Sequence, residues 1–233
     1  MAKRKTVFVD ADILVIGGGF GGCGAAYESR FWGRDKKVVV VGADKMSSIV
    51  DYTDRQTCVI FGDGAGAVLL EPEKNPGLGI LDSILKVDGA GGEYLKMIAG
   101  GSLNPATIQT VKSKHHYIFQ DGKTVFKFAV TKMADVSEQI MQRNHLNGDD
   151  IDWLVPHQAN ERIIDSMQKK FGIDKNKIIK TVSQHANTSA ASIPLALYEA
   201  VKEKKIRSGN LLAFEAIGGG LTWGASLVKY GRP

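Results

Sequence analysis

The sequence Lys37-Val-Val-Val-Val41 places four valines in a row directly after a lysine. A strand that is apolar on both faces is typical of a sheet buried between two layers. On the N-terminal side of this run, the hydrophobic pattern predicts a strand over residues 13–16 and a helix over residues 21–32. The three segments together predict a strand-helix-strand unit within residues 10–41.

The rest of the chain shows the same alternation of strands and helices. Alternating apolar residues predict strands, and apolar residues three or four positions apart predict helices. The expected strands cover residues 57–61 and 65–71 (paired as a hairpin), 79–87, 152–156, 210–216 and 223–230, and the expected helices cover residues 131–145, 160–171 and 189–204. This alternation indicates an α/β protein with mixed sheets. A Pro-Gly pair at residues 76–77 predicts a boundary between an N-terminal unit, 1–76, and a C-terminal unit, 77–233.

The composition is that of a globular protein. Thirty lysines and arginines against 25 aspartates and glutamates give a net charge of +5, a mild excess that favours an acidic protein partner over nucleic acid. No apolar run reaches the ~18 residues that a membrane-spanning helix needs, and the basic start lacks the long uncharged core of a signal peptide. Two cysteines cannot form a disulfide framework. We therefore expect a soluble, cytoplasmic protein that binds neither membranes nor nucleic acid.

Glycine is the unusual feature of the composition, with 27 residues against only 6 prolines. The glycines gather next to the expected strands, where they permit tight turns and close approaches of the backbone. In the first cluster, Gly17, Gly19 and Gly22 match the G-x-G-x-x-G pattern between a strand and a helix. This pattern is typical of loops that hold a dinucleotide pyrophosphate at a helix N-terminus. Gly42, however, stands where the second strand should end in an acidic residue, so an FAD-binding loop and a purely structural turn both stay open.

Two resemblances to known families divide the chain. Residues 10–41 are similar to the N-terminal FAD-binding segment of the adenylylsulfate reductase α subunit. The second resemblance rests on five motifs in family order: VGADKMSS (41–48), FGDGAGA (61–67), PHQAN (156–160), NTSAAS (187–192) and GGGLTWG (218–224). With these motifs, residues 39–233 resemble a β-ketoacyl-acyl carrier protein synthase III, a condensing enzyme of the thiolase fold.

The second resemblance implies a fold. The family has two pseudo-equivalent α/β halves, each with a five-stranded sheet, stacked as a layered α-β-α-β-α sandwich. The resemblance therefore implies an α/β, thiolase-like protein with a complete C-terminal half and a truncated, rearranged N-terminal half. Residues 10–41 would take the place of a strand-helix-strand segment of the family, which makes the chain an apparent chimera.

The second resemblance also implies a chemistry. The family condenses an acyl primer with a malonyl thioester in fatty acid biosynthesis, using a cysteine, a histidine and an asparagine. By motif, His157 and Asn187 match the last two, and both can donate hydrogen bonds to a thioester oxygen while CO₂ departs. Taken without the motifs, His157 could instead be a core histidine and Asn187 a turn residue or helix cap. The resemblance implies coenzyme A thioesters and acyl carrier protein as substrates and partners, and no required cofactor or metal.

Four further residues match substrate-contacting positions of the family. Arg162 is expected to dock acidic acyl carrier protein or a coenzyme A phosphate, or else to be a solvated helix residue. Phe126 falls in the region of the acyl and pantetheine tunnel, or else in an aromatic core. Asn160 and Gly219 lie inside two of the five motifs. The family is dimeric through its N-terminal half, so a homodimer is left open for this chain.

The nucleophile of the family has no match in this sequence. The family carries a cysteine in a turn of small residues in its N-terminal half, and residues 10–41 occupy that place without such a motif. Cys23 lies near an expected helix N-terminus, where the dipole lowers a thiol pKa, and is a candidate surrogate. The sequence therefore predicts a condensing enzyme with reduced or absent activity. An FAD-binding oxidoreductase fragment and a non-catalytic chimeric fold remain the alternatives.

Overall fold

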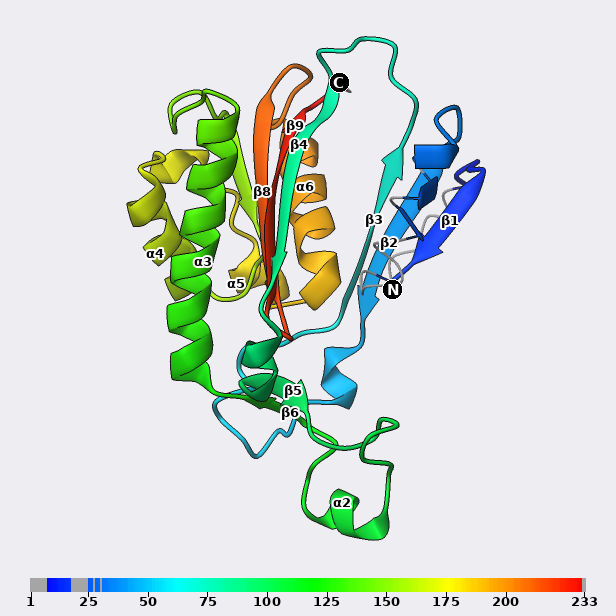
Figure 1. Cartoon of the computed structure of the whole chain (residues 1–233), viewed down its shortest axis with the longest axis vertical. Coiled ribbons are helices and arrows are strands. Elements are labelled where there is room, and N and C mark those ends of the chain that lie inside the picture. The colour runs from blue at the N-terminus through cyan, green and yellow to red at the C-terminus, as the bar shows by residue number, and fades with distance from the viewer. Residues whose placement is uncertain (1–7, 18–24, 27, 30, 232–233) are drawn as a thin grey trace.

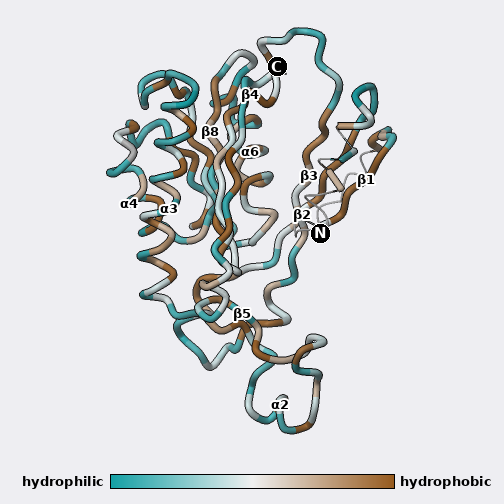
Figure 2. The backbone as a smooth tube through the Cα atoms, viewed as in Figure 1, coloured by the Kyte–Doolittle hydropathy of each residue, from teal (hydrophilic) through white to brown (hydrophobic). Residues whose placement is uncertain are grey.

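The computed structural model describes residues 8–17, 25–26, 28–29 and 31–231. These residues form two larger sheets joined by a linker, residues 71–78, and a small arm that extends beyond both sheets (Figure 1). The linker is exposed and mostly hydrophilic (Figure 2). None of the described helices is long and apolar enough to cross a membrane.

The first sheet has three strands, β1 (Ile13–Ile16), β2 (Val38–Asp44) and β3 (Gly64–Leu70). β1 runs parallel to β2, and β3 runs antiparallel to β2 on its other side. Between β1 and β2, the described residues 25–26, 28–29 and 31–32 are helical, so the expected strand-helix-strand unit is present. Of the four valines, Val38 is fully buried and the other three are half-buried. Complete burial of this strand, as the valine run predicted, therefore holds only at its start.

The second sheet has four strands in the order β4 (Gly79–Val87), β9 (Thr222–Lys229), β8 (Leu211–Gly218) and β7 (Trp153–Pro156). β7 and β8 are parallel, and β9 is antiparallel to β8 and to β4. One parallel bridge, from residue 154 to residue 178, extends the sheet beyond β7. The expected five strands per half are thus reduced, among the described residues, to four strands and a bridge here and to three strands in the first sheet.

The two sheets share one arrangement of three strands. In the second sheet, β8 pairs parallel with β7 and antiparallel with β9. In the first sheet, β2 pairs parallel with β1 and antiparallel with β3. In the second sheet β4 pairs with the outer edge of β9, whereas no described residue pairs with the corresponding edge of β3. The repeated arrangement agrees with the expected pair of pseudo-equivalent halves.

Helices pack on both faces of the second sheet (Figure 1). α3 (Gly122–Arg143) and α4 (Glu161–Phe171) lie on one face, over a core that includes Ile140 and Leu154. α6 (Ser192–Lys202) lies between the two sheets, in contact with both β3 and β7. The described layers therefore follow the order helix, sheet, helix, sheet, in agreement with the expected layered sandwich.

Glycines allow the first sheet to approach the chain segment that leads into α6. A Cβ atom at Gly42 would lie 2.6 Å from the carbonyl oxygen of Ala190, and one at Gly66 would lie 2.6 Å from the Cβ of Pro194. Separations this short do not occur between real side chains and their neighbours, so only glycine fits at these positions. The sequence prediction of close backbone approaches at the glycine clusters is correct here.

Two expectations about local structure are wrong. Residues 57–60 form turns rather than a strand, and β3 pairs with β2 instead of closing a hairpin. The expected helix over residues 131–145 is longer at its start, because Asp121 caps α3 by accepting a hydrogen bond from the Thr124 N–H. The start of α3 is therefore set by a cap that lies well before the apolar pattern used to predict the helix.

The sequence analysis did not foresee the arm between β4 and α3. The arm contains β5 (Leu95–Met97), α2 (Ile108–Lys112) and β6 (Ile118–Gln120), and β5 pairs antiparallel with β6. It forms the lower end of the molecule in Figure 1. Elements of 3 to 5 residues are too short to show a hydrophobic period, which explains the omission.

Candidate active site

His157 directly follows β7, at the point where this strand ends beside β8. Its backbone N–H donates to the carbonyl oxygen of Glu215 over 2.7 Å, which continues the β7–β8 pairing by one residue. Its side-chain Nδ1 lies 2.6 Å from the hydroxyl oxygen of Ser192, the first residue of α6. The sheet therefore fixes the backbone of His157, and the helix fixes its ring.

The Ser192 hydroxyl determines where the proton of the His157 ring lies. The hydroxyl oxygen is 3.4 Å from the backbone nitrogen of Gln158, whose N–H donates to it. With its oxygen accepting from Gln158, the hydroxyl has its own proton available for His157 Nδ1, and in this arrangement the proton of the neutral ring is on Nε2. Burial lowers the pKa of His157 from 6.5 to about 4. At pH 7 the ring is therefore neutral and offers Nε2–H as a hydrogen-bond donor.

Asn187 lies in the turn between α5 (Val182–His185) and α6. Its side-chain oxygen accepts from the Ser189 N–H over 3.0 Å, and no described residue accepts a hydrogen bond from its Nδ2 amide. Its backbone forms a parallel bridge with Phe61, in which the Asn187 N–H and C=O each take part in a bond of 3.0 Å. The chain segment before β3 thus supports the turn, and the Nδ2 amide remains available as a donor.

Gln158 is the functional residue that the sequence analysis missed. It is fully buried, and its side-chain nitrogen donates to two backbone carbonyl groups while its oxygen accepts from two backbone N–H groups. These bonds join the end of β7 to residues 179–182, the segment that enters α5. Gln158 therefore fixes the position of His157 relative to the Asn187 turn. The only signal in the sequence is its place beside the histidine, since a single glutamine creates no periodic pattern.

A cleft of about 230 Å³ opens beside these residues. Three segments form its walls: the turns before β3, the start of α4, and α5 with the residue after it. The lining residues are Val59, Ile60, Ala159, Asn160, Glu161, Val182, Ser183 and Ala186. Five of these are apolar, and only Glu161 is charged. Ala186 immediately precedes Asn187 and Ala159 follows His157 by two positions, so the cleft is lined by close sequence neighbours of both residues.

The four predicted substrate-contacting residues do not all lie at this cleft. Asn160 lines it, but its side-chain oxygen is used to cap α4 by accepting from an N–H over 2.9 Å. Arg162 is exposed on α4, and its guanidinium carbon lies 5.4 Å from the ring centre of Phe126 on α3. Phe126 is half-buried against the core. Gly219 lies in the turn between β8 and β9, where a Cβ atom would be 3.2 Å from the carbonyl oxygen of Leu95.

Several predicted residues lie outside the described part of the chain. Gly19, Gly22 and Cys23 belong to this group, so the FAD-binding loop and the surrogate nucleophile stay predictions. Gly17 is described, and its φ of 107° is one that favours glycine. Its N–H donates to the carbonyl oxygen of Val41 over 2.8 Å, which ends β1. Among the described residues, no three histidine, cysteine or acidic side chains are grouped so that they could hold a metal ion.

Glu215 is a second buried ionisable residue near the site. It lies on β8, and the hydroxyl of Ser137 on α3 donates to its Oε1, while its Oε2 has no partner among the described residues. Burial raises the pKa of Glu215 to about 8. The carboxyl group is therefore protonated at pH 7. It is linked to His157 through the backbone only, which makes it part of the support and not a reacting group.

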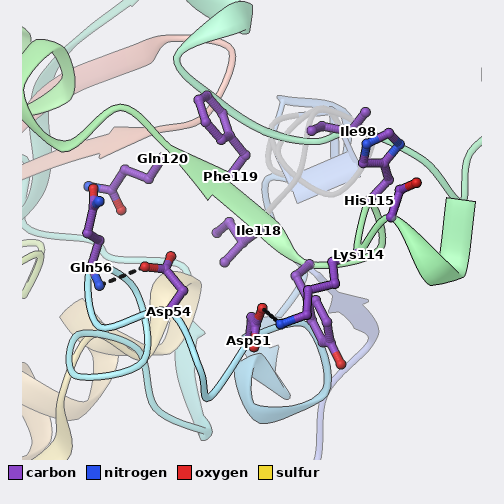
Figure 3. Close-up of a pocket in the computed structure, with 11 residues that line it drawn as sticks. Asp51, Asp54, Gln56, Ile98, Lys114, His115, Ile118, Phe119 and Gln120 are labelled. Atoms are coloured by element: carbon purple, nitrogen blue, oxygen red, sulfur yellow. Dashed lines mark hydrogen bonds and ion pairs between the residues drawn. The ribbon is translucent and has the colours of Figure 1, made fainter.

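A larger cavity, of about 320 Å³, lies where the arm meets the turns before β3 (Figure 3). At its wall, Lys114 Nζ lies 2.7 Å from a carboxylate oxygen of Asp51, and this hydrogen bond lowers the pKa of Asp51. Asp54 accepts from the backbone N–H of Gln56 over 2.9 Å. None of the predicted site residues lines this cavity. Its charged groups already pair with neighbours, so we do not include it in the candidate site.

Comparison with known proteins identifies relatives of this chain. The family model described as 3-oxoacyl-[acyl-carrier-protein (ACP)] synthase III matches residues 21–89, and the model of the C-terminal part of the same enzyme matches residues 141–230. The β-ketoacyl-[acyl-carrier-protein] synthase III of Chlorobium chlorochromatii (strain CaD3) is 52% identical over 199 residues, which are 85% of this chain and 60% of that protein. The protein of the same name from Koribacter versatilis is 48% identical over the same share of each chain.

Solved structures give the same result. The 3-oxoacyl-[acyl-carrier-protein] synthase III of Aquifex aeolicus VF5 superimposes with a TM-score of 0.78 and 37% identity, over 91% of this chain and 64% of that one. The corresponding enzyme of Pseudomonas aeruginosa PAO1 gives a TM-score of 0.82 and 28% identity, over 95% and 77%. These neighbours confirm the predicted thiolase-like α/β fold.

The two family matches together cover more than half of the chain and include His157, Asn187 and the segment around Phe61. The first match begins at residue 21, inside the segment that resembles an FAD-binding protein, so the interpretation as a chimera stays a prediction. The chain spans about 60% of the length of the curated relatives it matches. Over residues 21–89 and 141–230, the chain belongs to the 3-oxoacyl-[acyl-carrier-protein] synthase III family.

Proposed function

We propose that this chain acts on malonyl thioesters of coenzyme A or acyl carrier protein, as an acyltransferase-type condensing enzyme of fatty acid biosynthesis that keeps the decarboxylation step. The observation that carries this proposal is the hydrogen bond between Ser192 and His157 Nδ1, because it leaves Nε2–H as a donor. The Nδ2 amide of Asn187 is the second donor. Sequence neighbours of both residues line the same cleft, which has mostly apolar walls.

In the proposed step, the bond between the malonyl carboxylate and the α-carbon breaks. The electron pair stays on the α-carbon and is shared with the thioester oxygen as an enolate, and CO₂ leaves. His157 Nε2–H and Asn187 Nδ2–H donate to this oxygen, where negative charge develops. Such donors each contribute about 2.7–4 kcal/mol to transition-state stabilisation in other enzymes. A proton from water then adds to the α-carbon and gives the acetyl thioester.

The low pKa of His157 defines its role in this step. With a pKa of about 4, the ring stays neutral across the neutral pH range. It therefore stabilises the enolate by donating a hydrogen bond and does not transfer a proton to it. This role needs only the fixed ring and Asn187, so it can operate without the nucleophile of the family.

Full condensation needs a nucleophile that carries the acyl primer. In condensation, the enolate carbon forms a bond to the acyl carbonyl carbon instead of taking a proton, the bond between that carbon and the nucleophile breaks, and the nucleophile leaves as a thiolate. Cys23 is the candidate for the nucleophile, and we expect condensation to be impaired because the family motif around the nucleophile is missing from the sequence. The exposed Arg162, on α4, is the candidate contact for acyl carrier protein or a coenzyme A phosphate. The proposed reaction requires no FAD.

The test of the proposal is release of CO₂ from malonyl-coenzyme A. Replacing His157 by alanine removes one of the two donors, so the rate should fall roughly 100-fold to 1,000-fold. His145→Ala is the matched control, because His145 is an exposed histidine at the end of α3. Equal CO₂ release by the native protein and His157→Ala would show that the proposed site does not perform the step.

The covalent step has a separate test. The protein is incubated with acetyl-coenzyme A, and the mass of the peptide that contains Cys23 is measured. We expect an added acetyl group on this peptide in the native protein and none in Cys23→Ser. Acetylation of the peptide that contains Cys58, or of neither peptide, would remove Cys23 as the nucleophile and leave the decarboxylation proposal standing.

A further inference from the structure

Ala186 has a backbone conformation that alanine normally avoids. Its φ is 60° and its ψ is −166°, a region that is populated almost only by glycine. The conformation is held from both sides. The Ala186 N–H donates to the carbonyl oxygen of Val182 over 2.8 Å, and the next residue, Asn187, is bridged to Phe61. The methyl group of Ala186 is therefore kept in a strained position directly beside a candidate donor.

The direction of this methyl group relates it to the cleft. Ala186 is half-buried and lines the cleft. On its other side, its Cβ lies 3.0 Å from the place that a Cβ atom at Gly62 would occupy. The methyl group thus lies close to Gly62 in the segment before β3, and only a glycine at position 62 leaves room for it.

We propose that the Ala186 methyl group is a specificity determinant that restricts the cleft to unbranched malonyl thioesters. This inference rests on the proposed function, in which Asn187 holds the thioester oxygen. The malonyl α-carbon is bonded to the carbon that carries this oxygen, so a methyl branch on the α-carbon comes close to the residue before Asn187. A pocket wall can discriminate against one additional methyl group by roughly 10-fold to 200-fold.

The experiment compares two variants with malonyl-coenzyme A and methylmalonyl-coenzyme A. Ala186→Gly removes the methyl group and also relieves the backbone. Lys204→Gly is the control, because Lys204 has the same φ of 60° but is an exposed residue after the end of α6, outside the cleft lining. Both variants thus remove a side chain from a left-handed residue, and only one of them changes the cleft.

We expect Ala186→Gly to raise kcat/KM for decarboxylation of methylmalonyl-coenzyme A about 10-fold, mainly through KM, with a much smaller change for malonyl-coenzyme A. Lys204→Gly should leave kcat/KM unchanged for both thioesters. Binding of both thioesters is measured by calorimetry in parallel. If the native protein turns over neither thioester but Ala186→Gly binds methylmalonyl-coenzyme A more tightly than the native protein does, the inference is supported.

Two other outcomes separate the inference from the proposed function. Suppose that the native protein decarboxylates malonyl-coenzyme A and that Ala186→Gly has the same ratio of kcat/KM for methylmalonyl-coenzyme A to kcat/KM for malonyl-coenzyme A as the native protein. The inference is then overturned and the proposed function stands. If no variant binds or turns over either thioester, the proposed function is wrong, and the inference is overturned with it.

Discussion

At the scale of single residues, hydroxyl and amide groups outside the reacting pair decide what the pair can do. The Ser192 hydroxyl oxygen accepts from the Gln158 N–H and lies 2.6 Å from His157 Nδ1, to which the hydroxyl donates when the ring carries its proton on Nε2. His157 and Asn187 could be recognised from their motifs. Ser192 lies within the motif of residues 187–192, yet its pairing with His157 could not be predicted, because it depends on the contact of α6 with the end of β7.

Replacing Ser192 by alanine should lower the rate of malonyl-coenzyme A decarboxylation without a comparable change in KM. Without the donor to Nδ1, the proton of the neutral ring no longer has to lie on Nε2. A hydrogen bond of this kind is worth about 1 kcal/mol, so we expect kcat to fall roughly 5-fold to 10-fold. Steady-state kinetics would measure the effect. Ser48→Ala is the control, since the hydroxyl of Ser48 is exposed and bonds only to the carbonyl oxygen of Lys45. Equal kcat values in native protein and Ser192→Ala would contradict this role.

The buried carboxyl group of Glu215 should make stability depend on pH. Its pKa is raised from 4.5 to about 8 in the folded state, so the folded protein binds this proton more tightly than the unfolded chain does. The stabilisation is complete below pH 4.5 and is lost as pH rises through 8. His157 has the opposite effect, because its pKa is lowered from 6.5 to about 4 and stability from this group rises with pH between these values.

The effect of Glu215 should therefore be seen alone between pH 6.5 and 8. In this window we expect the free energy of unfolding to fall by up to about 1.4 kcal/mol per pH unit. Urea unfolding at several pH values would measure the slope. Glu215→Gln keeps the shape and cannot ionise, so its slope should be flatter. Parallel slopes for the two proteins would show that Glu215 is not the group that titrates.

At the scale of secondary-structure elements, a glycine lets β3 pack closely against the start of α6. Gly66→Ala should destabilise the protein by roughly 1–3 kcal/mol, because the new methyl group would overlap the ring of Pro194 at the start of α6. Gly122→Ala is the matched control, since nothing lies within 4 Å of a Cβ atom at this first residue of α3. Thermal unfolding of both variants would measure the difference. Equal melting temperatures would mean that β3 can move away from α6 without cost.

The accuracy of the sequence prediction differed between elements for physical reasons. The strand at Gly79–Val87 and the helix that starts after Asn160 were predicted within one residue, because both have a long hydrophobic period and the helix has a cap. Residues 57–60 were predicted as a strand because they form a mostly apolar run directly before a glycine cluster, but they form turns that support Asn187. The partner of this segment lies more than 100 residues away in the sequence, and a local pattern cannot reveal such a contact.

At the scale of the whole molecule, the candidate site belongs to neither part of the chain alone. Its donors follow the linker of residues 71–78, but the bridge at Phe61 and the cleft residues Val59 and Ile60 precede it. The sequence motifs correctly identified the family on both sides of the linker. They could not show that the two parts meet at Asn187, because this depends on how the first sheet packs against α6. The division into units 1–76 and 77–233 therefore stays a prediction.

Cutting the linker should test this division. A specific protease site inserted between Glu73 and Lys74 lies in an exposed segment without helix or strand. After cleavage we expect the two fragments to elute together in size-exclusion chromatography, because β2 and β3 pack against the start of α6. The same protein left uncut is the control. Separate elution of folded fragments would instead show two independent domains.

One edge of β3 has no partner strand among the described residues, and this has a practical consequence. The carbonyl group of Val41 accepts from Gly17, the residue after β1. Alternate residues of β2 therefore bond to β3, and the backbone groups of Ala65, Ala67 and Leu69 point away from the sheet. Residues 64–70 carry no charge and no proline, the two features that usually keep such an edge from joining another molecule. At high concentration, copies of this protein should therefore aggregate by pairing strands at this edge. The substitution Ala67→Lys should prevent this aggregation, so that concentrated solutions stay free of turbidity during storage and crystallisation.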